Sequence, residues 1–218
     1  MDRKIAASAL ALCLLAGPAL AHPHVWTEMR STLMVNGENL ITGISVEWTF
    51  DEGYSGFALE GLDLNKDGTY DAEEIRPLTE ENIGSLKESV YFGFLRQSEH
   101  LLKHGPVTEY AQTHKDGRLT LFFVLPLEAP VDPRKGVFDY KIYDPDFFIA
   151  FDYQKTDPVD VEGTLPAGCT SELKPPLTDD ELAQKRDFLA TKDLNWQNDT
   201  GEDFGSIFAQ PVVVTCGP

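Results

Sequence analysis

Cysteine is scarce in this 218-residue chain, which has three, at positions 13, 169 and 216, and no C-x-x-C pair. The lack of closely spaced cysteines argues against a zinc ribbon and against a thioredoxin-like redox motif. Basic residues are also few, 18 against 36 acidic ones, so the formal net charge is −18. Because nucleic acid and anionic lipid surfaces repel so acidic a chain, we expect neither as a partner.

Motifs of the common hydrolases and nucleotide-binding enzymes are missing as well. The chain has no G-x-S-x-G, no H-E-x-x-H and no glycine-rich phosphate loop. Pairs of carboxylates are frequent, but in such an acidic chain they carry little information. Tyr143-Asp144-Pro145-Asp146 is either a site or a turn, and the composition favours a turn. We therefore expect a binding protein and not an enzyme.

Long apolar runs are absent after the first 21 residues. Arg3 and Lys4 precede a mostly apolar stretch from Ile5 to Leu15, and Ala19-Leu20-Ala21 follows it. This order of a basic, an apolar and a small-residue segment is typical of a secretory signal peptide. A membrane span needs about 20 apolar residues, so the stretch is too short to be an anchor. The sequence predicts a signal peptide at 1–21 and one exported domain at 22–218 that does not span a membrane.

Two cysteines remain after removal of the expected signal peptide. Cys169 and Cys216 would then form an even pair in an oxidising compartment, where disulfides persist. We expect a disulfide that ties the end of the chain to the body of the domain. A metal site or redox pair is the alternative, and the wide spacing argues against it.

Short stretches of β-forming residues separated by turn signals run along most of the chain. Val25–Val35 and Leu40–Phe50 flank a turn at 36–39, and further strands are expected at 90–95, 107–113, 119–125, 138–143, 147–151, 159–161 and 212–214. A helix is predicted from Thr178 to Thr191, with an acidic first turn. The pattern predicts a mainly β (α+β) fold, an antiparallel β-sandwich with a helical EF-hand-like insert at about 51–88 and a C-terminal helix.

Twelve residues, from Asp63 to Glu74, have the spacing of a calcium-binding EF-hand loop. Gly68 stands where that loop must turn sharply. The expected ligands are oxygens of the Asp63, Asn65, Asp67, Asp71 and Glu74 side chains and the backbone carbonyl of Thr69. A plain acidic turn is the alternative, but a turn needs neither Asp71 nor Glu74 at these offsets.

The surroundings of this loop predict weak binding. EF-hands usually come in pairs, and the chain has one such loop. Gly53, Gly56 and Gly61 weaken the incoming helix, and Pro77 is expected to interrupt the outgoing one. We expect a dissociation constant on the order of 0.1–1 mM, which suits a structural calcium ion better than a signalling switch.

Histidines near the expected mature N-terminus form a second candidate metal site. His22 and His24 lie two residues apart and would face the same way on an extended chain. With the α-amino group of His22 they offer nitrogen ligands for zinc, copper, nickel or cobalt. Asp51, Glu52 or Asp144 would complete the shell if the fold brings them close. The alternative is a solvated terminus. His100, His104 and His114 are expected to be surface residues in loops.

Several segments together resemble a known family. They are Ala21-His22-Pro23-His24-Val25-Trp26, Trp48-Thr49-Phe50-Asp51-Glu52, the Asp63–Glu74 loop, Tyr91-Phe92, the stretch 119–127, Tyr143-Asp144-Pro145, Phe208-Ala209 and Cys216. With them the chain resembles domain-of-unknown-function family 1007, a family of bacterial periplasmic proteins. The resemblance implies an accessory role in the uptake of zinc, nickel or cobalt, with an inner-membrane metal permease as partner. A calcium-stabilised protein-interaction module without transition-metal cargo is the alternative.

Overall fold

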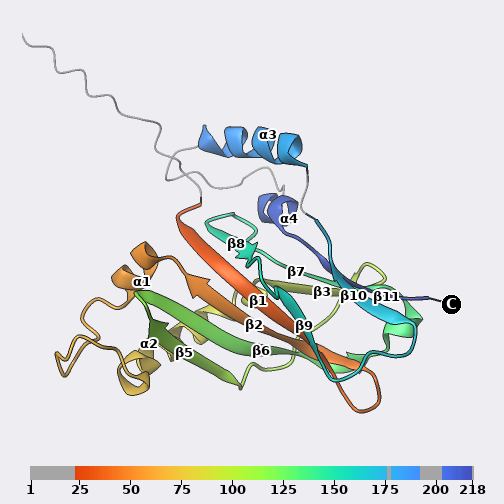
Figure 1. The fold of residues 1–218 in the computed structure, drawn as a ribbon, viewed down its shortest axis with the longest axis horizontal. Coiled ribbons are helices and arrows are strands. Elements are labelled where there is room, and N and C mark those ends of the chain that lie inside the picture. The colour runs from red at the N-terminus through yellow and green to blue at the C-terminus, as the bar shows by residue number, and fades with distance from the viewer. Residues whose placement is uncertain (1–22, 176–177, 192–202, 218) are drawn as a thin grey trace, which may run out of the picture.

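The computed structural model describes residues 23–175, 178–191 and 203–217, and in this part of the chain two β-sheets dominate (Figure 1). The six-stranded sheet has the order β5-β6-β2-β1-β8, and β9 also pairs with β1. The five-stranded sheet has the order β10-β11-β7-β3-β4. The strands are β1 Val25–Val35, β2 Ile41–Phe50, β3 Gly93–Gln97, β4 His100–Leu101, β5 Tyr110–Lys115, β6 Arg118–Val131, β7 Phe138–Ile142, β8 Ile149–Tyr153, β9 Val159–Glu162, β10 Cys169–Leu173 and β11 Val212–Cys216. The mainly β fold is confirmed.

Strand pairing agrees with an antiparallel sandwich except along one strand. β1 and β2 form the predicted antiparallel hairpin, and β6 pairs antiparallel with both β2 and β5. On its other side β1 pairs in parallel with β8 and, further along, with β9. The parallel pairs were not predicted, because local alternation shows which residues form a strand but not which neighbour it finds.

The two sheets pack face to face over one hydrophobic core. Alternate residues of β1 from Val25 to Val35 are buried, as the period of two requires. Trp48 and Phe123 from the six-stranded sheet belong to the same buried cluster as Phe138 and Tyr140 from the five-stranded sheet. The Trp48 and Phe123 rings meet edge to face, with centroids 4.9 Å apart. The sandwich therefore depends on aromatic packing at its centre.

A hydroxyl cluster crosses this core. Ser31 Oγ on β1 lies 2.8 Å from Tyr140 Oη on β7 and 3.2 Å from Tyr153 Oη on β8. Burial raises the pKa of Tyr153 to about 12, although its hydroxyl contacts with Ser31 and Tyr140 lower it in part. Burial also raises the pKa of Tyr140. Both phenols are therefore neutral in the folded protein at any physiological pH.

This hydroxyl cluster predicts a loss of stability at alkaline pH. A tyrosine whose pKa is higher in the folded than in the unfolded chain stabilises the fold below the unfolded value of about 10, and that stabilisation disappears as pH rises through the folded value. We expect the unfolding free energy to fall by roughly 1–3 kcal/mol between pH 10 and 12. Tyr153→Phe should make that decrease smaller, and chemical denaturation at several pH values measures it. An equal decrease in variant and wild type would contradict the assignment.

Helices α1 (Glu52–Ala58) and α2 (Ala72–Leu86) lie between β2 and β3 and occupy one end of the six-stranded sheet (Figure 1). The expected interruption at Pro77 is wrong, because α2 continues through it. Proline removes one backbone donor near the start of the helix, and burial of Ile75, Thr79 and Ile83 compensates for this loss. Thr79 also donates its hydroxyl hydrogen to the carbonyl of Ile75.

The strand expected at 90–95 begins late. Val90, Tyr91 and Phe92 have φ angles of 53°, 54° and 52°, so they form a left-handed turn, and β3 begins at Gly93. Three consecutive non-glycine residues in this region cost about 1–2 kcal/mol each. Tyr91 is buried, and the carbonyl of Phe92 accepts a hydrogen bond from the amide of Tyr143. Tertiary contacts therefore override the β-propensity of these residues.

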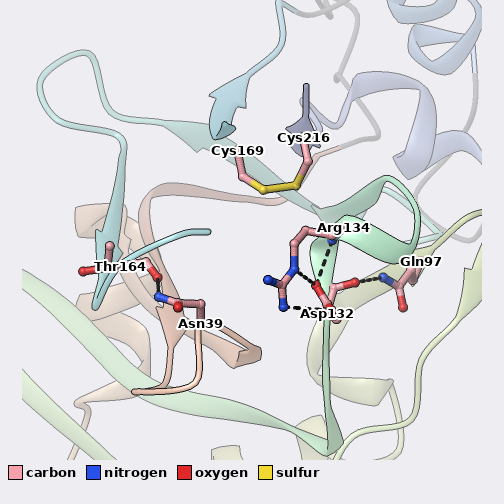
Figure 2. Close-up of a disulfide and its surroundings, with 7 residues drawn as sticks. All are labelled: Asn39, Gln97, Asp132, Arg134, Thr164, Cys169 and Cys216. Atoms are coloured by element: carbon pink, nitrogen blue, oxygen red, sulfur yellow. Dashed lines mark hydrogen bonds and ion pairs between the residues drawn. A yellow bond between two sulfur atoms is a disulfide. The ribbon is translucent and has the colours of Figure 1, made fainter. Parts of the chain in front are cut away.

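The C-terminal part adds α3 (Asp179–Ala190), α4 (Phe204–Phe208) and the predicted disulfide. The helix expected at 178–191 is confirmed as α3. Cys169 and Cys216 face each other across the β10–β11 pair and are bonded (Figure 2). In the same region the Asn39 side chain donates to the carbonyl of Thr164, which fixes the β1–β2 turn to the segment before β10.

Two predictions concern export. The predicted signal peptide, residues 1–21, lies outside the described residues. Within the part of the chain that the structure describes, no helix is both long and apolar enough to cross a membrane.

Candidate metal centre

The predicted calcium loop connects α1 to α2 and curls back on itself. Gly68 has a φ of +80°, a conformation that glycine adopts without strain. Asp63 accepts hydrogen bonds from the backbone amides of Asp67 and Gly68, at 3.2 and 3.1 Å. The first side chain of the loop therefore faces the turn in its middle.

The central side chains also point inward along the loop. Asn65 Oδ1 accepts from the amide of Asp67 at 2.8 Å, and Asp67 Oδ1 accepts from both the amide and the hydroxyl of Thr69. These two bonds from Thr69 lower the pKa of Asp67, so its carboxylate is ionised at neutral pH. Oxygens at alternate positions thus surround the same backbone turn.

Glu74 closes the loop from its last position. Only 8% of this residue is exposed, although it bears a carboxyl group and lies in an otherwise solvated segment. Its Oε1 accepts from the amides of Leu64 and Asn65, at 3.0 and 3.3 Å, and its Oε2 accepts from the amide of Asp71. One carboxylate therefore joins the beginning of the loop to its end.

Asp71 also acts as the N-cap of α2. Its Oδ1 accepts from the amides of Glu73 and Glu74, and together with Glu74 it forms a reciprocal capping box. The same two carboxylates thus begin the outgoing helix and close the loop. Truncation of the Glu74 side chain is therefore expected to affect both.

Coordination itself remains a prediction. Among residues 23–175, 178–191 and 203–217, no group of three or more His, Cys, Asp or Glu side chains is arranged to hold a metal ion. The loop carboxylates accept hydrogen bonds from their own backbone instead. The donor set does fit calcium chemically, because it consists of hard oxygens from five side chains, with Glu74 able to offer both of its carboxylate oxygens, and from the Thr69 carbonyl.

The sheet supports this single loop from the side. Tyr70, the eighth loop residue, packs edge to face on His114 of β5, with ring centroids 5.0 Å apart. Ser55 of α1 is fully buried and its Oγ accepts from the amide of Leu119 on β6. His114 was expected at the surface and is instead half-buried. Neither Tyr70 nor Ser55 was predicted from the sequence, although an aromatic residue inside a polar loop was an available signal for Tyr70.

Only one of the two histidines of the second candidate metal site belongs to the described residues. His22 lies outside the described residues. His24 is described: its amide donates to the carbonyl of Phe148 at 2.8 Å, and its ring lies 4.7 Å from the Phe148 ring. The structure therefore places this segment of the N-terminus beside the residue that precedes β8.

The carboxylates suggested as further ligands have structural roles. Asp51 accepts from the amides of Trp26 and Tyr54 and is the N-cap of α1. Asp144 is buried and accepts from the amides of Asp146, Phe148 and Ile149. Asp51 is therefore bonded to Trp26, two residues after His24. Asp144 is bonded to Phe148, whose carbonyl accepts the hydrogen bond from the His24 amide. Glu52 is exposed at the start of α1.

The remaining histidines are not one cluster. His100 is exposed in β4, and its Nδ1 lies 2.8 Å from the Ser98 carbonyl. His104 was expected to be a solvated surface residue, but it is half-buried with Nε2 2.8 Å from the Gly93 carbonyl. Burial lowers the pKa of His104, although the bond to Gly93 raises it in part. This histidine is therefore neutral at pH 7 and supports the start of β3.

Comparison with known proteins gives a family and two relatives. The model of the family described as "Protein of unknown function (DUF1007)" matches residues 7–216. An uncharacterized protein of Haemophilus influenzae is 26% identical over 199 residues, which is 90% of this chain and 92% of the relative. An uncharacterized 15.5 kDa protein in the trpE 3' region of Spirochaeta aurantia is 30% identical over 102 residues, 47% of this chain and 72% of the relative.

Proposed function

This chain belongs to the DUF1007 family of proteins of unknown function, and we propose that it is an exported, non-enzymatic metal-binding protein with a calcium site at Asp63–Glu74. The calcium ion would be held by oxygens of Asp63, Asn65, Asp67, Thr69, Asp71 and Glu74. Its role would be structural: it would fix α1 and α2 to the end of the six-stranded sheet.

The geometry of Glu74 is the observation that carries this proposal. A buried carboxylate in a solvated, acidic segment is costly unless it is paired or hydrogen-bonded. Glu74 is buried and reaches back to the amides of Leu64 and Asn65, across the full length of the loop. An acidic turn that only reverses the chain requires no such closure.

Calorimetric titration with calcium tests the proposal. The chain beginning at His22 should bind one calcium ion with a dissociation constant on the order of 0.1–1 mM. Magnesium should bind more weakly, because it demands a smaller octahedral site. If the titration detects no heat of calcium binding up to 10 mM calcium, the loop does not have this function.

The contact between Tyr70 and His114 of β5 predicts that a residue outside the loop contributes to calcium affinity. EF-hand loops usually support each other in pairs, and the contact that this loop makes instead joins Tyr70 to His114 on the edge strand β5. His114→Ala should weaken calcium binding by about threefold to tenfold, since an aromatic contact contributes about 0.5–1.5 kcal/mol. Calorimetry of wild type and variant measures the difference.

His100→Ala is the matched control, because His100 is exposed on the other sheet. It should leave calcium affinity unchanged. Equal affinity of the His114 variant and the wild type would show that the sheet does not support the loop.

We further propose that His22 and His24 bind a transition metal as cargo in the periplasm. Zinc, nickel, cobalt and copper suit the two imidazoles and the α-amino group, and an inner-membrane metal permease is the proposed recipient. The disulfide between Cys169 and Cys216 supports an oxidising compartment. Elemental analysis of protein with a free His22 should find one such metal, and His22→Ala with His24→Ala should remove it.

A calcium-stabilised interaction module is the second candidate. In that case the histidines hold no cargo, and the exposed sheet surface binds a partner protein. Calcium alone would then raise the melting temperature, whereas zinc, nickel, cobalt and copper would have no effect. Thermal unfolding in each metal separates the two candidates.

A further inference from the structure

A cleft of about 940 Å³ lies beside the N-terminal half of β1, outside the calcium loop. β1 contributes one wall, the beginning of α1 a second, and the end of β8 with the residues after it a third. Arg118, at the start of β6, also lines the cleft. The lining residues are Trp26, Thr27, Glu28, Asp51, Glu52, Arg118, Asp152, Tyr153, Gln154 and Lys155.

An aromatic surface is available in this cleft. Trp26 is 49% exposed, although tryptophan usually buries most of its surface. Its amide donates to Asp51 Oδ2 and its carbonyl accepts from the amide of Asp51, so the backbone is held on both sides. The indole is thus presented from a rigid strand.

The charge of the cleft is negative. Its lining has four carboxylates, from Glu28, Asp51, Glu52 and Asp152, against the cations Arg118 and Lys155. Burial raises the pKa of Asp51, but hydrogen bonds from the Trp26 and Tyr54 amides outweigh it and lower the pKa overall, so this carboxylate is ionised.

The Arg118 guanidinium is held by the backbone and paired with a carboxylate of the cleft. Its guanidinium donates to the carbonyls of Phe50 and Thr49, at 2.8 and 3.1 Å, and pairs with Glu28 at 3.2 Å. Within the described part of the chain, neither Glu52 nor Asp152 has an ion pair. These two carboxylates therefore remain available to a bound cation.

From this combination we infer that the cleft binds an organic cation, a primary ammonium group on a flexible chain, between the Trp26 indole and the carboxylates of Glu52 and Asp152. Cations over an indole face are attracted by about 0.5–2 kcal/mol, and carboxylates add to this attraction. The shared chemistry fits both a free polyamine and a lysine side chain of a partner protein. The site is distinct from the proposed calcium loop.

Titration with two probes tests the inference and distinguishes its sources. Spermidine represents the free amine, and acetylated trilysine amide represents the protein side chain. Calorimetry of the chain beginning at His22 in 150 mM NaCl should show saturable binding of at least one probe. Trp26→Ala should weaken it by about tenfold, and the double variant Glu52→Gln with Asp152→Asn by a similar factor.

Matched controls separate a site from general attraction to an acidic protein. Phe57→Ala removes an exposed aromatic residue outside the cleft, and Glu81→Gln with Glu88→Gln removes two exposed charges from the segment around α2. Both controls should bind like wild type, and every variant should keep its melting temperature. Glu74→Gln should also bind the probe normally, which makes this result independent of the calcium proposal.

The titrations of wild type, cleft variants and controls either support or overturn the proposed cation site. Binding of either probe that only the cleft variants weaken supports the inference, and the preferred probe identifies the source of the cation. Absence of binding up to 10 mM, or an equal loss in the controls, would overturn it.

Discussion

Replacement of Glu74 by glutamine is expected to abolish the thermal stabilisation of this protein by calcium. In 10 mM calcium a site with a dissociation constant of about 0.1–1 mM stabilises the wild type by roughly 1.4–2.7 kcal/mol. For a domain of this size that corresponds to a rise in melting temperature of about 3–10 °C. The variant should show a rise of less than about 1 °C, because one neutral amide oxygen replaces a bidentate carboxylate. Differential scanning calorimetry with and without calcium measures both values.

The Glu74 variant keeps most of the local structure, so the result is interpretable. Glutamine retains an oxygen that can accept from the amides of Leu64 and Asn65, and it is also favoured at this position of a capping box. Glu73→Gln is the control, since Glu73 is exposed and forms only a surface ion pair with Arg76. Its response to calcium should equal that of wild type. A full response from the Glu74 variant would mean that calcium acts elsewhere.

Removal of the disulfide should cause the largest loss of stability. Cys169 and Cys216 are 47 residues apart, and a cross-link over such a loop restricts the unfolded chain by about 4 kcal/mol. Cys169→Ala with Cys216→Ala should therefore lower the melting temperature by about 8–16 °C. Denaturant unfolding, with and without a reducing agent, measures the same difference in the wild type.

Thr170→Ala with Thr215→Ala is the matched control for the disulfide variant. This pair occupies the next rung of the β10–β11 ladder, and both residues are exposed. A cross-strand pair contributes about 0.2–1 kcal/mol, so the control should lose much less stability. Comparable losses in the two double variants would mean that ladder packing, and not the cross-link, holds the end of the chain.

Local patterns were enough for much of the fold. Alternation along 25–35 predicted β1 with its observed bounds, and the strands expected at 107–113 and 119–125 correspond to the antiparallel pair β5 and β6. Strand β10 was missed, because Cys169-Thr170-Ser171-Glu172-Leu173 has little apolar content. It forms a strand because β11 and the disulfide hold it in place. The left-handed turn at Val90–Phe92 was missed for the opposite reason, since its β-propensity was overridden by burial of Tyr91.

The sequence by itself determined the order of oxygens in the Asp63–Glu74 loop, because calcium ligands in such a loop follow one another at offsets along the chain. It likewise determined the mainly β fold and the pairing of the two late cysteines. Only the tertiary structure decided that β5 supports the loop through His114, that β1 has parallel neighbours, and that Trp26 and Arg118 line the same cleft. The physical reason is that these contacts join residues far apart in the chain, and periodicity carries no information about such neighbours.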